Sequence, residues 1–273
     1  MTRYSWKLAF VETAMILVAL LFAFPIFVLI NLSFKAENDQ TSPLEISQSP
    51  TFQNYIDAWE KADLGSALWY SFLIAFLSLI GIVLVSALAA YPLVRLKTRF
   101  SGFSYWFILV GLLVPFQVAL IPLYQTFRDL GLLGSVWALV LFYTGLQVPF
   151  STFLYVGFLR ALPREYEEAA WVDGASKIKA YWLVVFPMLR PVTGTVVILN
   201  AIFIWNDFLT PLLYLSGTGV VTIPVALFSF VGQYVSSWPL VFAGMVIGIM
   251  PILLAYFLLQ KTIIKGFSGG LKG

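Results

Sequence analysis

Residues 163–187 read PREYEEAAWVDGASKIKAYWLVVFP, a polar stretch between two long apolar segments. Pro163 suits the first position of a helix, where its missing N–H leaves no hydrogen bond unmade. Gly174 is a natural helix stop, and Ser176 is a natural cap for a second helix that runs to Pro187. The stretch therefore predicts two short helices joined by a tight turn.

One face of the first predicted helix carries small side chains. Tyr166, Ala169, Ala170 and Asp173 recur at helical spacing, so they share one side of that helix. Alanines on that side let a partner approach the backbone closely. We interpret the stretch as a docking element outside the bilayer; the plainer alternative is an ordinary amphipathic loop.

The rest of the chain is dominated by apolar residues. Of its 273 residues, 60% are hydrophobic and 11% are charged, whereas a soluble domain has about a quarter charged. A helix needs about 20 apolar residues to cross the ~30 Å apolar slab of a bilayer. Backbone groups in lipid must be hydrogen-bonded internally, which favours helices. The sequence predicts an all-α membrane protein with six transmembrane helices, at 12–33, 69–93, 103–126, 135–158, 192–214 and 239–260.

The placement of basic residues indicates the orientation. If the N-terminus is inside, all of the 16 Lys and Arg residues except Lys35, Lys61 and Arg128 fall on the cytoplasmic side. This bias follows the positive-inside rule, so we expect both termini in the cytoplasm. The net charge of +3 then marks cytoplasmic edges and does not indicate a nucleic-acid partner.

The uncharged stretch 216–238 is the exception to the simple pattern of spans. Its apolar part, from Thr222 to Val231, is short for a span and contains Pro224. If it crossed the membrane, the lysines of the tail would lie outside. We therefore expect a loop on the outward side with a re-entrant or surface-lying turn.

The residue types exclude several kinds of chemistry. There are no cysteines and no histidines, so disulfides, His/Cys metal sites and His-based or Cys-based catalysis are excluded. The glycines of the tail, 268–273, do not have the spacing of a phosphate-binding loop. We expect no catalytic residue, no metal and no cofactor in this chain.

An ionisable residue lies within the fifth predicted span, in the run Trp205-Asn206-Asp207-Phe208. Such a group at membrane depth is a functional candidate by default. Asn206 and Asp207 are candidates for a polar translocation path. Alternatively, Asp207 caps a break in the helix near Pro211 or pairs with a donor on a neighbouring helix. The structural roles are favoured.

Other polar and small residues occur within the predicted spans. Gln117 and Gln147 are candidates for the same path, although hydrogen bonds between helices explain them equally simply. Gly244 and Gly248 form a small-xxx-small face on the sixth span, which close helix packing explains. The outward loop 34–68 is either a solvated connector or a contact for an outside partner.

The polar stretch resembles the EAA loop of the membrane subunits of ATP-binding-cassette (ABC) importers, which docks into a groove on the cytoplasmic ATPase. The shared features are acid-Ala-Ala, a glycine four positions after the last alanine, and a hydrophobic-x-hydrophobic-Pro ending. Val184 and Phe186 depart conservatively from the usual Ile-x-Leu-Pro. The resemblance implies a set of ATPase-coupling residues: Glu168, Ala169, Ala170, Gly174 and Pro187.

The chain is also similar, over about residues 50–273, to the smaller maltose-type permease of carbohydrate-uptake ABC importers. Besides the EAA loop, this similarity rests on short motifs at 51–55, 121–124, 130–132, 205–208 and 265–270. It implies a type I ABC importer permease in the bacterial plasma (inner) membrane. The expected partners are a second permease, two cytoplasmic ATPase subunits that bind ATP and Mg, an extracytoplasmic sugar-binding protein and membrane lipid.

This resemblance implies three parts of the chain. Residues 1–68 hold the first helix and the outward loop, 69–261 the transmembrane core with the EAA loop, and 262–273 a cytoplasmic tail. The expected substrates are sugars or oligosaccharides, and the alternatives are other small polar solutes such as a glycerol phosphate or a polyamine. An ion-coupled secondary transporter has less support, because Asp207 is nearly alone as a buried ionisable group.

Overall fold

The computed structural model describes residues 6–36, 39, 41–233 and 237–270. This part of the chain consists of helices, turns and loops and contains no strand, so the prediction of an all-α protein is confirmed. The chain forms two compact units. Unit 1 comprises Met1–Gly65 and Ala226–Met250, and unit 2 comprises Ser66–Val225 and Pro251–Gly273.

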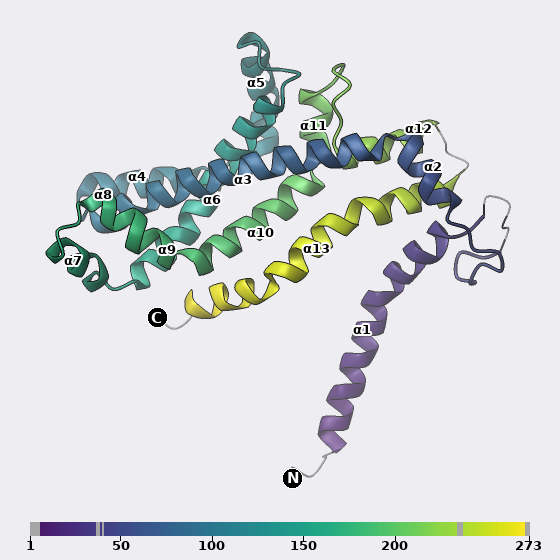
Figure 1. The fold of residues 1–273 in the computed structure, drawn as a ribbon, viewed down its shortest axis with the longest axis horizontal. Coiled ribbons are helices and arrows are strands. Elements are labelled where there is room, and N and C mark those ends of the chain that lie inside the picture. The colour runs from purple at the N-terminus through teal and green to yellow at the C-terminus, as the bar shows by residue number, and fades with distance from the viewer. Residues whose placement is uncertain (1–5, 37–38, 40, 234–236, 271–273) are drawn as a thin grey trace. The chain divides into compact units, whose positions relative to one another are not determined.

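The helices have the following bounds (Figure 1). They are α1 (Trp6–Ser33), α2 (Gln53–Lys61), α3 (Leu64–Arg95), α4 (Arg99–Val110), α5 (Phe116–Asp129), α6 (Val136–Ala161), α7 (Glu165–Val172), α8 (Lys177–Ala180), the π-helical turn η1 (Tyr181–Val185), α9 (Phe186–Met188), α10 (Arg190–Asn206), α11 (Leu209–Tyr214), α12 (Ile223–Gln233) and α13 (Trp238–Gly270).

Four of the described helices are long and apolar enough to cross a membrane. They are Leu8–Ser33 of α1, all of α3, all of α6, and Trp238–Leu258 of α13. The pair Lys177–Met188 and Arg190–Asn206, which bends by 68°, adds a fifth if it is counted as one span. The structure thus supports four of the six predicted spans as single helices, and a fifth if the bent pair is one span.

The predicted third span, 103–126, is not one continuous helix, and that prediction was wrong. Helix α4 ends at Val110, and α5 begins at Phe116 after Pro115 in an extended conformation with ψ of 121°. Proline has no N–H for the ladder, and its ring clashes with the carbonyl four residues earlier. The helix is therefore interrupted between Gly111 and Pro115.

The predicted fifth span, 192–214, is also interrupted, so it is not a single helix, and the alternative of a break near Pro211 is confirmed. Helix α10 ends at Asn206, Asp207 is extended with ψ of 123°, and α11 starts at Leu209. Pro211 has no N–H to donate to the carbonyl of Asp207, which favours an end to the helix at this point.

The stretch 216–238 contains the helix α12, which has 11 residues. This is about half of the length that spans a bilayer. The backbone N–H of Ile223 donates to Ser71 Oγ of α3 at 2.9 Å, which ties the start of α12 to α3. At the C-terminus α13 continues to Gly270, so most of the predicted tail 262–273 is helical; residues 271–273 lie outside the described residues.

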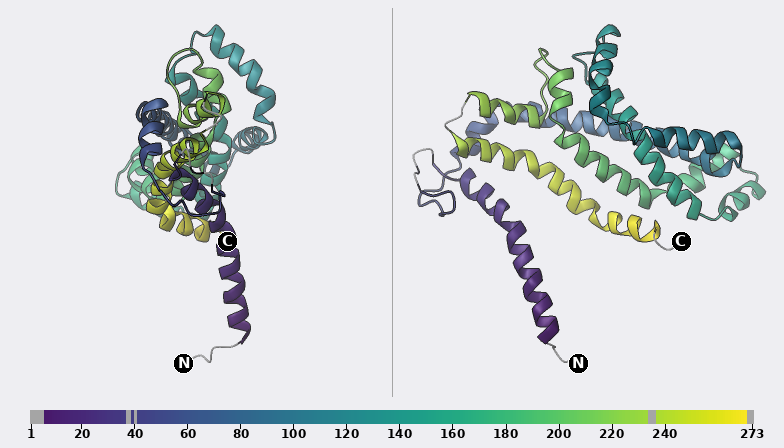
Figure 2. Two further views of the ribbon diagram at one scale, coloured as in Figure 1. Left: turned by 90° about the vertical axis from the view of Figure 1, so that its right-hand side faces the viewer. Right: turned by 180° about the vertical axis from the view of Figure 1, so that it is seen from behind.

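Helix α6 is the central element of unit 2 and packs against α4, α10 and α11. Polar bonds fasten it to α10: Tyr155 donates to Thr193 Oγ1 at 3.0 Å, and Asn200 Nδ2 donates to Ser151 Oγ at 3.1 Å. Between apolar spans such bonds hold helices together. In this unit the α7–α9 segment lies at the end where α3 terminates, and the view from behind shows the same arrangement (Figure 2).

In unit 1 the loop after α1 folds around a buried cation. Lys35, only 2% exposed, donates to Thr41 O at 3.1 Å, to Thr41 Oγ1 at 2.5 Å and to Ser42 O at 2.6 Å. Hydrogen bonds from Thr41 and Ser47 lower the pKa of Asp39 to about 2. These bonds join the described residues of the loop to one another.

Gly244, one residue of the small-residue face predicted on the sixth span, lies at a packing contact in unit 1. A Cβ placed on Gly244 of α13 would lie 2.7 Å from Leu227 Cδ2 and 3.2 Å from Phe230 Cε2, both on α12. A larger side chain at this position would require the side chain of Leu227 to shift. Gly244 therefore permits the close approach of α12 and α13.

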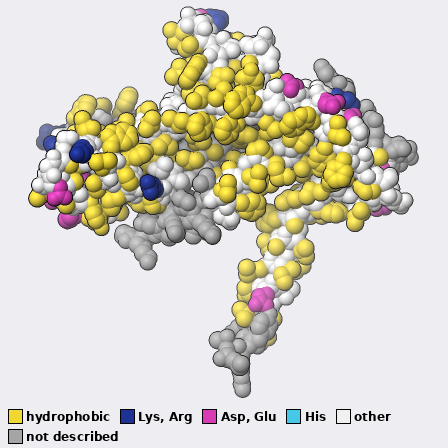
Figure 3. Space-filling model, viewed as in Figure 1, with side chains coloured by type: hydrophobic (Ala, Val, Ile, Leu, Met, Phe, Trp, Pro, Cys, Tyr) yellow, Lys and Arg dark blue, Asp and Glu magenta, His cyan; other side chains and the backbone are white. Residues whose placement is uncertain are grey.

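The described surface is largely apolar. Hydrophobic side chains cover most of the face shown in Figure 3. Large exposed side chains occur along the candidate spans, for example Phe22 at 74%, Phe72 at 52% and Leu254 at 57% exposed. A soluble monomer rarely exposes apolar patches above a few hundred Å². This surface is suited to lipid and to neighbouring membrane subunits.

Candidate functional site

The candidate docking element begins later than predicted. Pro163 does not take the first helical position: α7 starts at Glu165, with Arg164 as the residue that precedes it. Pro163 instead forces the preceding Leu162 into an extended conformation, with ψ of 119°, and so ends α6. The proline therefore separates the long helix from the short one.

Gly174 ends α7 as predicted. Its φ is +85°, which L side chains rarely adopt. Its N–H donates to Trp171 O at 3.0 Å, and the N–H of Ala175 donates to Ala170 O at 2.9 Å. These two bonds form the Schellman pattern that satisfies the last carbonyls of a helix. Glycine is required here because of this backbone conformation. Crowding is not the reason, since a Cβ placed on Gly174 would meet nothing within 4 Å.

The second short helix also forms where the sequence predicts it. Ser176 Oγ accepts the N–H of Lys179 at 3.3 Å, so the predicted cap is present. The helical path then runs through α8, the π-helical turn η1 and α9 to Met188, and Pro187 lies in the first turn of α9. The chain bends by 68° before it enters α10.

The residues predicted to couple to an ATPase lie on the accessible side of this element. Glu168, Ala169 and Gly174 are exposed, and Ala170 and Pro187 are half-buried. Apolar side chains accompany them: Val172 is 88% exposed and Ile178 is 74% exposed. This element thus exposes an acid, small residues and large apolar side chains, which is suited to contact with a protein.

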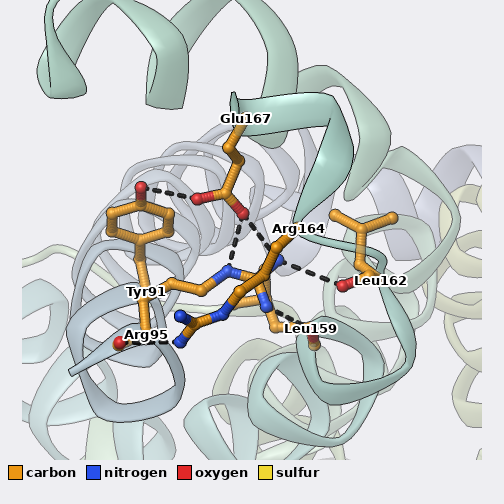
Figure 4. A network of polar contacts seen from close by, with 6 residues as sticks. All are labelled: Tyr91, Arg95, Leu159, Leu162, Arg164 and Glu167. Carbon is orange, nitrogen blue, oxygen red and sulfur yellow. Dashed lines mark hydrogen bonds and ion pairs between the residues drawn. The ribbon is translucent and has the colours of Figure 1, made fainter. Parts of the chain in front are cut away.

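The inner side of α7 is held by a buried ion pair that the sequence analysis missed. Glu167, one position before the predicted Glu168, is 1% exposed. Its Oε1 lies 2.6 Å from both Nε and an Nη of Arg95 at the end of α3, and Tyr91 donates to its Oε2 at 2.8 Å (Figure 4). The carboxylate therefore has a partner on each oxygen.

Two signals in the sequence could have found this network. Tyr91 and Arg95 are four residues apart, so they share one face at the end of a predicted span. Glu167 precedes the motif acid directly and lies in the first turn of α7. Without knowledge of which side of α7 faces the core, however, neither signal selects Glu167 over Glu168.

Asp207 has two partners within unit 2. Tyr143 of α6 donates to Asp207 Oδ2 at 3.0 Å, and the N–H of Thr210 donates to Asp207 Oδ1 at 3.3 Å. The carboxylate thus caps the start of α11 and bonds to a neighbouring helix. Asn206 is exposed, and its Nδ2 donates to Ile202 O of its own helix at 2.7 Å.

The four candidate path residues are not joined to one another. Gln117 is exposed on α5, and Gln147 is half-buried on α6. In the described part of the chain no hydrogen bond links any two of Gln117, Gln147, Asn206 and Asp207. The described residues also contain no group of three or more acidic side chains placed to hold a metal ion.

Comparisons with known proteins agree on one family. The family model described as "Binding-protein-dependent transport system inner membrane component" matches residues 82–268. The chain is 32% identical to the melibiose/raffinose/stachyose import permease protein MelC of Bacillus subtilis, over 90% of each chain. It is 34% identical to the multiple sugar-binding transport system permease protein MsmG of Streptococcus mutans, over 98% of this chain and 96% of that one.

A solved structure has the same fold. One chain of a bacterial ABC transporter involved in the import of the acidic polysaccharide alginate superposes with a TM-score of 0.82. The match covers 96% of this chain and 100% of that chain, at 20% sequence identity. This likeness concerns the arrangement of the helices.

Proposed function

Because the chain belongs to the family of binding-protein-dependent transport system inner membrane components, we propose that it is a permease subunit of an ATP-driven sugar importer. It forms half of a translocation path together with a second permease. Two ATPase subunits bind ATP and Mg on the cytoplasmic side, and a binding protein delivers the sugar from outside.

The observation that carries this proposal is the geometry of residues 163–188. Two short helices are set by the Schellman turn at Gly174, and their exposed side presents Glu168, Ala169 and Val172. An ATPase groove that binds this surface is thereby connected rigidly to the transmembrane helices. Each permease carries one such pair of short helices. Closure of the ATPase pair upon ATP binding would pull the two pairs together and open the permease pair outward.

The proposed topology has six spans. Helices α1, α3, α6 and α13 are four of them. The interrupted pair α4–α5 and the segment α10–α11 supply the other two, with their breaks at Pro115 and Asp207. The end that carries α7 is cytoplasmic, as are both termini. The division of the chain into 1–68, 69–261 and 262–273 follows this topology.

The proposed substrates are sugars or oligosaccharides. The names of MelC and MsmG, which match nearly the full chain at 32% and 34% identity, support this class. Measuring which sugars raise the melting temperature of the associated binding protein tests it. A binding protein that is stabilised by a glycerol phosphate or a polyamine, and by no sugar, would contradict it.

The test of coupling uses two acids on the same helix. Glu168→Lys should keep the permease assembled while reducing both transport and substrate-stimulated ATP hydrolysis, because a charge reversal at the docking surface disrupts recognition. Glu165→Lys, which makes the same charge change in the first turn of α7, is the matched control. Proteoliposomes that contain the whole transporter give both rates.

Two results would contradict the proposal. Full transport and full stimulation of ATP hydrolysis in a normally assembled Glu168→Lys complex would show that this surface does not couple. A wild-type chain that purifies without an ATPase and transports without ATP would contradict the importer function altogether.

A further inference from the structure

The Arg95–Glu167 ion pair is the best-defined contact between the candidate docking element and the long helices. The side chains are 10% and 2% exposed. One oxygen of Glu167 lies 2.6 Å from two nitrogens of Arg95, and the other accepts from Tyr91. Hydrogen bonds between ionised groups are about twice as strong as neutral ones. Both residues of the pair are therefore strongly constrained.

The same guanidinium group reaches a third element. Arg95 donates to the carbonyls of Leu159, at 3.4 Å, and Leu162, at 3.2 Å, at the end of α6. Carbonyls at a helix end lack a partner within their own helix. Arg164, directly before α7, donates in return to Arg95 O at 2.7 Å. The ends of α3 and α6 and the start of α7 thus meet at one cluster of charge-assisted bonds, as Figure 4 shows.

Helix α3 extends from this cluster to the opposite end of unit 2. From Arg95 back to Ser71 it spans roughly 36 Å at 1.5 Å per residue. Ser71 accepts the N–H of Ile223 at the start of α12. Along the way α3 packs tightly on α6, because a Cβ on Gly81 would lie 2.6 Å from Thr144 Oγ1. A shift of the Arg95 end is therefore passed along α3, which is one continuous helix through Pro92.

We propose that the Arg95–Glu167 pair is the mechanical link that transmits displacement of α7 to α3 and α6, a role that rests on the function proposed above. Glu168 faces the ATPase, and its neighbour Glu167 fastens the same short helix to the membrane core. A helix of two turns holds no fixed position by itself. Arg95 and Glu167 are positioning residues and do not contact the substrate.

The first test separates this linkage from a general loss of stability. The whole transporter is reconstituted with Glu167→Gln, which keeps the shape of the side chain and removes its charge. The matched control is Glu165→Gln, which removes the same charge from an exposed position of the same helix. The readout is the amount of sugar transported per ATP hydrolysed, in complexes that carry the normal complement of ATPase subunits.

The expected result is an assembled Glu167→Gln complex that still hydrolyses ATP and transports about tenfold less sugar per ATP, within the usual range of coupling free energies. Glu165→Gln should keep the wild-type ratio. An unchanged ratio in Glu167→Gln would overturn the linkage while leaving the importer function intact. Absence of an ATPase from the wild-type complex would overturn both, and this is seen before any variant is made.

A covalent replacement decides the matter if Glu167→Gln does not assemble. The chain has no cysteine, so Arg95→Cys with Glu167→Cys places two unique thiols that a short bis-maleimide can join. If the pair is a fixed link, joining the thiols should restore the ratio of transport to hydrolysis that the unjoined double variant has lost. If cross-linking instead blocks transport, the two residues must separate during the cycle, and the proposal is wrong.

Discussion

The carboxylate of Asp207 accepts hydrogen bonds from two different elements, Tyr143 of α6 and the backbone of Thr210 in α11. Asp207→Asn keeps an oxygen for Thr210, and its amide is able to donate to the Tyr143 hydroxyl. We therefore expect normal folding and an unchanged dependence of transport on sugar concentration. Asp207→Ala leaves both partners without an acceptor and should destabilise the protein by about 1–3 kcal/mol.

Thermal unfolding in detergent and transport kinetics measure these two effects separately. The contradicting outcome is an Asp207→Asn protein that unfolds at the wild-type temperature and yet binds sugar with strongly altered affinity. The carboxylate would then belong to the translocation path, the alternative that the sequence leaves open.

Glu167 and Glu168 are adjacent in the chain and have opposite surroundings. Glu167 is buried against Tyr91 and Arg95, which precede it by 76 and 72 positions, whereas Glu168 is exposed. The acid-Ala-Ala motif predicts the exposed Glu168, because the residues that form the recognition surface are close together in the sequence. The buried acid depends on how α7 packs against a helix far away in the sequence. No local pattern in an eight-residue helix specifies that orientation.

The turn between α7 and α8 is an element whose sequence requirement is simple to test. Gly174→Ala forces a residue with a Cβ into φ of +85°, which should destabilise the turn by about 1–2 kcal/mol. The amides of α7 should then exchange with deuterium about 5- to 30-fold faster, as hydrogen-exchange mass spectrometry of the purified transporter measures.

Gly157 of α6 provides the control for this element. Its Cβ would meet nothing within 4 Å, and its φ is not in the positive region. Gly157→Ala should therefore leave exchange unchanged or slow it, because alanine is the better helix former by about 1 kcal/mol. Equal exchange in Gly174→Ala and the wild type would show that the turn does not need glycine.

The helix breaks were less predictable than the caps. Apolar length predicted α1, α3, α6 and α13 correctly. The interruption at Pro115 was missed, and the one near Pro211 was predicted only as an alternative. Five other prolines of this chain lie inside helices, at Pro25, Pro92, Pro122, Pro149 and Pro251. Neighbouring helices can satisfy the groups that such prolines leave free. A proline in a span therefore does not specify a break, and its surroundings decide.

At the scale of the whole molecule, the large exposed apolar side chains along the described candidate spans imply contact with lipid and with partner subunits. Helix α1 has no buried residue in its most apolar window. Its helical conformation is therefore maintained by its own backbone hydrogen bonds within the surrounding lipid. The orientation of such a chain in the membrane therefore depends on which side its charged residues occupy, because the burial of side chains does not determine it.

The proposed orientation predicts which side of the membrane each polar segment reaches. The chain has no cysteine, so single substitutions report on one position each. Ile46→Cys, at a side chain 74% exposed in the loop after α1, should react with an impermeant maleimide in intact spheroplasts. Leu96→Cys, at a side chain 55% exposed beyond the end of α3, should react only after the membrane is opened. Labelling of both from the same side would refute a single crossing by α3. Labelling of Leu96→Cys in intact spheroplasts would also remove the docking element from the cytoplasmic face, because α3 ends beside α7.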